Sequence, residues 1–94
     1  MFKELTDQIE EMMSGKCTIL FVADACPKCN QLHNTISQVS ESTVYVVNLM
    51  NNLELAKKLG IQNVPLLCKF EGSKMTGKLP FEIATLSNVK KFLN

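Results

Sequence analysis

The sequence predicts an α/β fold in which a four-stranded mixed sheet is flanked by helices on both faces. Short, continuous apolar runs alternate along the chain with segments whose apolar residues recur every three or four positions. The first strand–helix–strand unit implies two parallel strands joined by a right-handed crossover. Two later strands are separated only by Glu71-Gly72-Ser73, which indicates an antiparallel hairpin.

The predicted elements follow in the order α-β-α-β-α-β-β-α. The first predicted helix ends at Gly15. The strand after it, Cys17 to Ala23, is mostly apolar. Such a run is typical of a central strand that is buried on both faces. The apolar residues that predict the first helix are Phe2, Leu5, Ile9, Met12 and Met13.

The rest of the chain continues this alternation of helices and strands. No repeat, linker or low-complexity segment divides the 94 residues, so we expect one domain, residues 1–94. The remaining predicted elements are a helix from Pro27 to about Ser40, a strand from Thr43 to Leu49, a short helix from Asn51 or Asn52 to Leu59 with Gly60 as its stop, hairpin strands from Leu66 to Phe70 and from about Lys74 to Leu79, and a final helix capped by Thr85 or Ser87.

Composition excludes several classes of function. The formal net charge is +1, so no charge excess favours nucleic acid or an anionic membrane. No apolar stretch approaches the roughly 20 residues of a membrane span, and the N-terminus lacks the pattern of a signal peptide. We therefore expect a cytoplasmic protein whose cysteines (Cys17, Cys26, Cys29 and Cys68) are reduced or catalytic. Two structural disulfides in a secreted domain are the alternative.

The motif Cys26-Pro27-Lys28-Cys29 lies between the central strand and the next helix. Proline fits the first helical turn, which places Cys26 at the helix N-terminus. Unpaired backbone N–H groups there, together with the charge of Lys28, lower the pKa of a thiol. We therefore expect Cys26 to be the attacking nucleophile and Cys29, one helical turn on, to be the resolving thiol. Pro27 and Lys28 are expected to contact the substrate.

A metal site is a weaker interpretation of the same cysteines. A structural zinc site usually needs four ligands, and the chain has one Cys-x-x-Cys motif. His33 could supply a third ligand, but polar neighbours along its helix favour an exposed residue, so we expect no metal. Cys68 is expected to pack in the core, whereas Cys17 is evenly balanced between packing and partial exposure.

On the order of its elements, the Cys26–Cys29 motif and a second motif, Val64-Pro65, the chain resembles the thioredoxin family over nearly its whole length. The family's first strand is not among the predicted elements. The resemblance implies a thioredoxin-like fold and a cis Pro65 facing the cysteine pair. It also implies that Val64 offers its backbone to the substrate chain. The expected function is a monomeric thiol-disulfide oxidoreductase and electron carrier without a cofactor. Its implied partners are a thioredoxin-reductase-type electron donor and disulfide-containing protein substrates.

The sequence departs from typical thioredoxins both beside the cysteine pair and at the residues that handle protons. Ala25 stands where the family has tryptophan, and Leu20 stands where it buries an acid. The lysine of the neighbouring strand is also absent from Thr43 to Leu49. A glutathione-dependent, glutaredoxin-like enzyme is one alternative, although Thr76 to Phe81 lacks that family's second glycine and acid. A non-catalytic module that binds a metal or a partner protein is the other.

Overall fold

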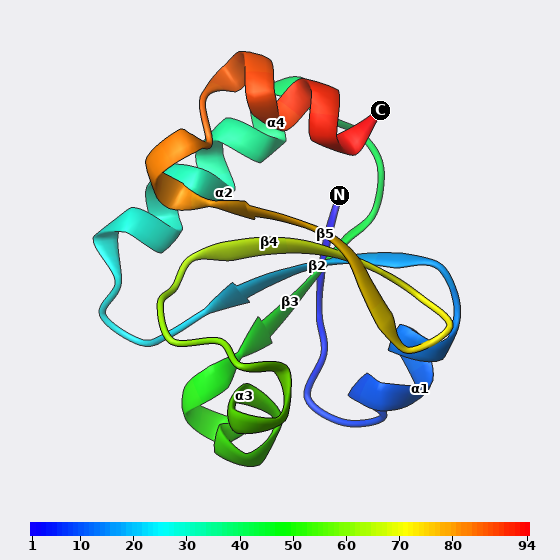
Figure 1. Cartoon of the computed structure of the whole chain (residues 1–94). Coiled ribbons are helices and arrows are strands. Elements are labelled where there is room, and N and C mark those ends of the chain that lie inside the picture. The colour runs from blue at the N-terminus through cyan, green and yellow to red at the C-terminus, as the bar shows by residue number, and fades with distance from the viewer.

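A computed structural model describes residues 1–94 and contains a five-stranded mixed sheet with helices on both faces (Figure 1). The strand order across the sheet is β1-β3-β2-β4-β5. No helix is both long enough and apolar enough to cross a lipid bilayer. The strands are β1 (Phe2–Glu4), β2 (Cys17–Val22), β3 (Val44–Asn48), β4 (Leu66–Glu71) and β5 (Lys74–Pro80).

The helices alternate with the strands until the terminal hairpin. Two short 3₁₀ helices, η1 and η2, were not anticipated by the sequence; they follow β3 and β5 respectively. The α-helices are α1 (Ile9–Ser14), α2 (Pro27–Val39), α3 (Leu53–Leu59) and α4 (Leu86–Leu93), and the 3₁₀ helices are η1 (Leu49–Asn51) and η2 (Phe81–Ile83).

Strand β2 lies at the centre of the sheet. It pairs in parallel with β3 and antiparallel with β4. Ile19, Leu20 and Phe21 are each 0% exposed, which confirms the prediction of a strand buried on both faces. The register places Leu66 opposite Phe21. The start of β4 therefore lies beside the carboxyl end of β2, from which the loop to Cys26 continues.

The prediction for the N-terminus was wrong in one respect. Residues Phe2–Glu4 form a fifth strand, β1, which pairs in parallel with β3 at the sheet edge, and α1 begins only at Ile9. Phe2 packs against the buried cluster on one face of the sheet, while Leu5 packs against the cluster on the other face. A single helical stripe would have placed both side chains on the same side.

The side chains of β2 divide the core into two clusters. Figure 1 shows α2 and α4 on one side of the sheet and α1 and α3 on the other. Alternation along β2 sends Leu20 to the first side and its two neighbours to the second. The buried residues on the α2 and α4 side are Leu20, Leu32, Ile36, Val44, Leu67, Leu79 and Val89. Those on the α1 and α3 side are Ile9, Met13, Ile19, Phe21, Val47, Leu49, Leu55, Cys68 and Phe70.

The ends of the shorter helices follow from local chemistry. Thr85, rather than Ser87, caps α4, because its hydroxyl accepts a hydrogen bond from the N–H of Asn88 at 3.1 Å. Gly60 ends α3 in a left-handed conformation with φ of 70°. Glycine adopts this conformation without the steric cost that a side chain would add.

Candidate active site

The Cys26–Cys29 motif lies where the chain leaves the central strand and enters α2. Cys26 is the N-cap residue of this helix, and Pro27 occupies its first turn. Cys26 and Cys29 form a disulfide, and their Cα atoms are 5.2 Å apart. The backbone N–H of Cys29 donates a hydrogen bond to the Cys26 Sγ atom at 3.2 Å. The sulfur of Cys26 thus occupies the position that a capping side chain normally takes.

The two cysteines differ in their access to solvent. Cys29 is only 4% exposed, whereas Cys26 is half-buried. The residue before the pair, Ala25, has a positive φ of 51°. An incoming disulfide or thiol can therefore reach the outer sulfur, of Cys26, while the inner sulfur, of Cys29, is covered by the protein.

Pro65 lies at the same end of the sheet as the cysteine pair. Its peptide bond with Val64 is cis, and the proline ring is buried while Val64 is half-buried. Because Leu66 is opposite Phe21 in the register, Pro65 comes beside the carboxyl end of β2. The loop to Cys26 begins at that end, so the two motifs are brought together by the pairing of β2 with β4.

Lys28, between the two cysteines, reaches toward η2. Its ammonium group lies 5.5 Å from the ring centroid of Phe81, within cation–π range. Phe81 also lines a hollow of about 250 Å³ together with Val64 and Pro65. This contact could not be predicted from the sequence, because the two residues are far apart in the chain and lie on different elements.

A second hollow, of about 180 Å³, borders Val64 from the side of α3. Seven of its eight lining residues are hydrophobic. Met50 and Leu53, which contribute to it, are 54% and 65% exposed, and Ala23 belongs to the loop that leads to Cys26. The surface beside Val64 is therefore apolar on this side.

Leu20 and His33 are the two positions near α2 that bear on proton transfer from Cys29. Leu20 is 0% exposed and packs in the apolar cluster beneath α2. The exposed His33 stacks on Phe2, with ring centroids 3.7 Å apart and an interplanar angle of 20°. No group of three or more His, Cys, Asp or Glu side chains is close enough to hold a metal ion.

Cys17 and Cys68 are free thiols on neighbouring strands. Cys68 is 0% exposed, which confirms the prediction that it packs in the core, whereas Cys17 is partly buried. Burial raises the pKa of Cys68 to about 12, an effect that the positive charge of Lys78 partly opposes. Burial also raises the pKa of Cys17. Both shifts disfavour the reactive thiolate.

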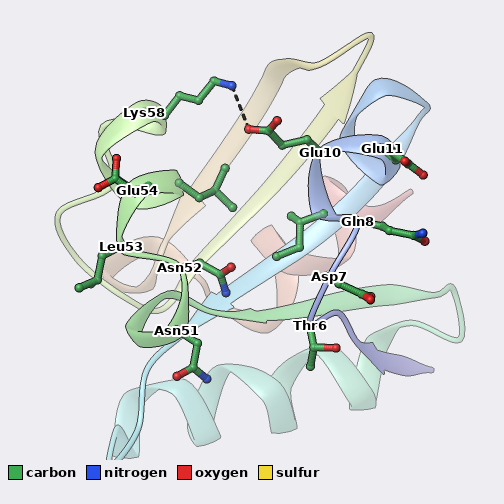
Figure 2. A pocket seen from close by; sticks show the side chains of 12 residues that line it. Thr6, Asp7, Gln8, Glu10, Glu11, Asn51, Asn52, Leu53, Glu54 and Lys58 are labelled. Atoms are coloured by element: carbon green, nitrogen blue, oxygen red, sulfur yellow. Dashed lines mark hydrogen bonds and ion pairs between the residues drawn. The ribbon is translucent and has the colours of Figure 1, made fainter.

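A hollow of about 730 Å³ lies between α1 and α3 and includes neither cysteine of the disulfide (Figure 2). Three of its four acidic residues, Glu10, Glu11 and Glu54, belong to first helical turns, where the helix dipole favours negative charge. Glu10 also pairs with Lys58 at 2.9 Å, but both side chains are about two-thirds exposed, at 64% and 66%. These charges therefore stabilise helix ends, and we assign no chemistry to this hollow.

Fold and site together define a class: a protein of thioredoxin-like fold with a disulfide-forming Cys-x-x-Cys pair at the start of α2 and a cis-proline before β4. No protein-family model matches the chain, and no curated protein sequence is similar to it. The likeness to known proteins therefore lies in the structure.

The solved structures that it resembles include several thioredoxins. That of Malassezia sympodialis (Mala s 13) has a TM-score of 0.83 at 16% sequence identity, over 98% of this chain and 89% of that one. The oxidised thioredoxin of Plasmodium falciparum has a TM-score of 0.77 at 18% identity, over 99% and 95%. The reduced thioredoxin pre-protein of Schistosoma mansoni has a TM-score of 0.74 at 18% identity, over 98% and 94%. The chain thus has the thioredoxin fold with a highly divergent sequence.

Proposed function

We propose that the protein is a thiol-disulfide oxidoreductase that reduces protein disulfides through Cys26 and Cys29. The observation that carries the proposal is the position of the half-buried Cys26 at the N-cap of α2, where its sulfur accepts the N–H of Cys29. In the reduced protein the same N–H can stabilise a thiolate, which is the form that attacks disulfides.

The reaction proceeds by two thiol-disulfide exchanges. The Cys26 thiolate attacks one sulfur of the substrate disulfide, a mixed disulfide forms, and the other substrate sulfur leaves as a thiolate. The Cys29 sulfur, as a thiolate, then attacks Cys26, which releases the second substrate thiolate and closes the Cys26–Cys29 bond. The substrate gains two electrons, and the protein loses two.

The surroundings of the disulfide suit a polypeptide substrate. Val64 can present its backbone to an extended chain, in the manner of strand addition, and the hollows on either side of it can receive neighbouring side chains. Pro27 and Lys28 lie between the cysteines and complete the contact surface. A reductase of the thioredoxin-reductase type, in the cytoplasm, would return electrons to the pair.

The test is the reduction of insulin disulfides by dithiothreitol, with and without the protein. The parent protein should accelerate the reaction catalytically, and Cys26→Ser should abolish the acceleration. Cys29→Ser should instead accumulate a mixed disulfide, detectable by mass spectrometry of the intact protein. Equal activity of Cys26→Ser and the parent would overturn the mechanism.

A further inference from the structure

We propose that Met50 is an oxidation site through which hydroperoxides lower the activity of the neighbouring cysteine pair. This inference rests on the proposed function and adds a modifiable residue to the same site. It is carried by a contact between the Met50 sulfur and the loop that leads to Cys26.

Met50 lies in η1, and the residue is 54% exposed. Its Sδ atom accepts a hydrogen bond from the backbone N–H of Asp24 at 3.4 Å. Asp24 is two residues before Cys26 in the chain. The thioether is thus open to small reagents in solution and in contact with the backbone that positions the nucleophile.

Asn48 strengthens this connection. Its Oδ1 atom accepts the N–H of Met50 at 2.9 Å, and its Nδ2 group donates to the Asp24 carboxylate at 2.7 Å. The loop before Cys26 is therefore held to the end of β3 through the Asp24 side chain and to η1 through the Met50 sulfur. Oxidation would alter the sulfur contact directly.

The apolar hollow beside Val64 gives oxidation a second effect. Met50, Leu53 and Ala23 all line this hollow. A sulfoxide oxygen is polar and strongly hydrated, so it opposes the burial of an apolar substrate side chain there. Oxidation should therefore weaken substrate binding as well as loosen the loop.

The other four methionines do not share this position. Met13 is only 4% exposed, and Met12 and Met75 are partly buried. Met1 is 67% exposed, but it lies at the chain terminus, where its ammonium group donates to the carbonyl of Ser42. Met1 therefore serves as an internal control for exposure without contact to the active site.

A hydroperoxide is the oxidant that converts the Met50 thioether to a sulfoxide. A sulfur lone pair attacks the terminal oxygen, the O–O bond breaks and an S–O bond forms. The sulfur loses two electrons, and the proton of the terminal oxygen passes to the leaving oxygen, which departs as water or an alcohol. The product sulfoxide can be reduced again by methionine sulfoxide reductases, so the modification is reversible.

The experiment treats the disulfide form of the full chain with hydrogen peroxide, because the closed bond protects both active-site thiols. Peroxide is then removed, and oxidation is located by peptide mass mapping. Met50 should gain one oxygen, and kcat/KM for insulin reduction should fall about threefold to tenfold, the effect of losing roughly one hydrogen bond. Hydrogen exchange at the Asp24 amide should become faster, because a sulfoxide sulfur is electron-poor.

Two variants control the result. In Met50→Leu the ratio of treated to untreated activity should stay near one, whereas Met75→Leu should lose activity as the parent does. Three results would overturn the inference. Met50 could stay unmodified while Met1 is oxidised, or the ratio of treated to untreated activity could be unchanged in the parent. The third is a loss of activity in Met50→Leu equal to that of the parent. An untreated parent without insulin-reducing activity would overturn the proposed function, whereas unchanged exchange at Asp24 after complete Met50 oxidation would overturn only this inference.

Discussion

The Cys26 Sγ atom accepts a hydrogen bond from the backbone N–H of Cys29, with 3.2 Å between nitrogen and sulfur. The bond exists because Cys26 is the N-cap residue and Cys29 lies one turn inside α2. When the disulfide is reduced, this donor and the dipole of α2 favour negative charge on the outer sulfur. The inner sulfur has no equivalent position at the helix end.

The first prediction concerns the order in which the thiols react. In the reduced protein at about pH 7, we expect iodoacetamide to alkylate Cys26 at least roughly tenfold faster than Cys29, because helix N-termini raise the thiolate fraction. Peptide mapping after timed quenching measures both rates. Cys17 and Cys68 provide internal controls, since burial raises the pKa of each. Similar rates at Cys26 and Cys29 would remove the basis for calling Cys26 the nucleophile.

The second prediction concerns the contact between Lys28 and Phe81. We expect the pair to contribute about 0.5–1 kcal/mol to the free energy of unfolding, as exposed cation–π pairs do. A double-mutant cycle of Lys28→Gln and Phe81→Leu, measured by urea unfolding of the oxidised proteins, isolates this coupling. The Lys69–Phe92 pair, at 4.6 Å, offers a matched cycle away from the site. Additive effects of the first two substitutions would mean that the ammonium gains nothing from the ring.

The third prediction concerns Leu20, the position at which a buried acid would be expected in thioredoxins. Leu20→Asp should lower the free energy of unfolding by about 3–5 kcal/mol at pH 7, because it places an unpaired carboxylate in an apolar cluster. The loss should shrink as the pH falls, since burial favours the protonated form of the new carboxyl group. Leu20→Asn should be destabilising without this pH dependence. A carboxylate tolerated without loss of stability would contradict the packing described here.

The fourth prediction follows from the pKa of Cys68, which burial raises from 9.0 to about 12. Above pH 9 the unfolded chain loses this proton while the folded protein keeps it, so stability is present below that pH and falls as the pH rises. The free energy of unfolding should fall by up to about 1.4 kcal/mol per pH unit more steeply than in Cys68→Val. The free energy of unfolding can be measured by urea unfolding of both proteins between pH 9 and pH 10. If it declines equally with pH in the parent and in Cys68→Val, the Cys68 thiol does not control the decline.

Much of the fold could be predicted because the patterns are local. The apolar run of β2, Pro27 at the start of α2 and the turn at Gly72 each determine their own conformation. The β1 strand could not be predicted in this way. It has three residues, and only its pairing with β3 defines it. The spacing of Phe2, Leu5 and Ile9 imitates a helix, although the first two pack on opposite faces of the sheet.

The candidate site, like the fold, has one part that could be predicted from the sequence and one part that could not. The motifs around Cys26 and Pro65 are visible in the sequence, and the pairing of β2 with β4 brings them to one end of the sheet. The contacts of Lys28 with Phe81 and of Met50 with Asp24 join distant segments. Neither contact could be predicted from the sequence. A phenylalanine whose ring contacts a cation, or a methionine whose sulfur accepts an N–H, cannot be told in a sequence from one that only packs against other apolar residues.

The reduction potential of the Cys26–Cys29 pair tests the central claim most directly. It can be measured by equilibrating the protein with defined ratios of reduced and oxidised dithiothreitol or glutathione and quantifying the two thiols by alkylation and mass spectrometry. A thiol-disulfide oxidoreductase of this fold should have a potential between about −180 and −290 mV, the span of such dithiol proteins. A potential well below about −300 mV, typical of structural disulfides, would contradict the proposed function.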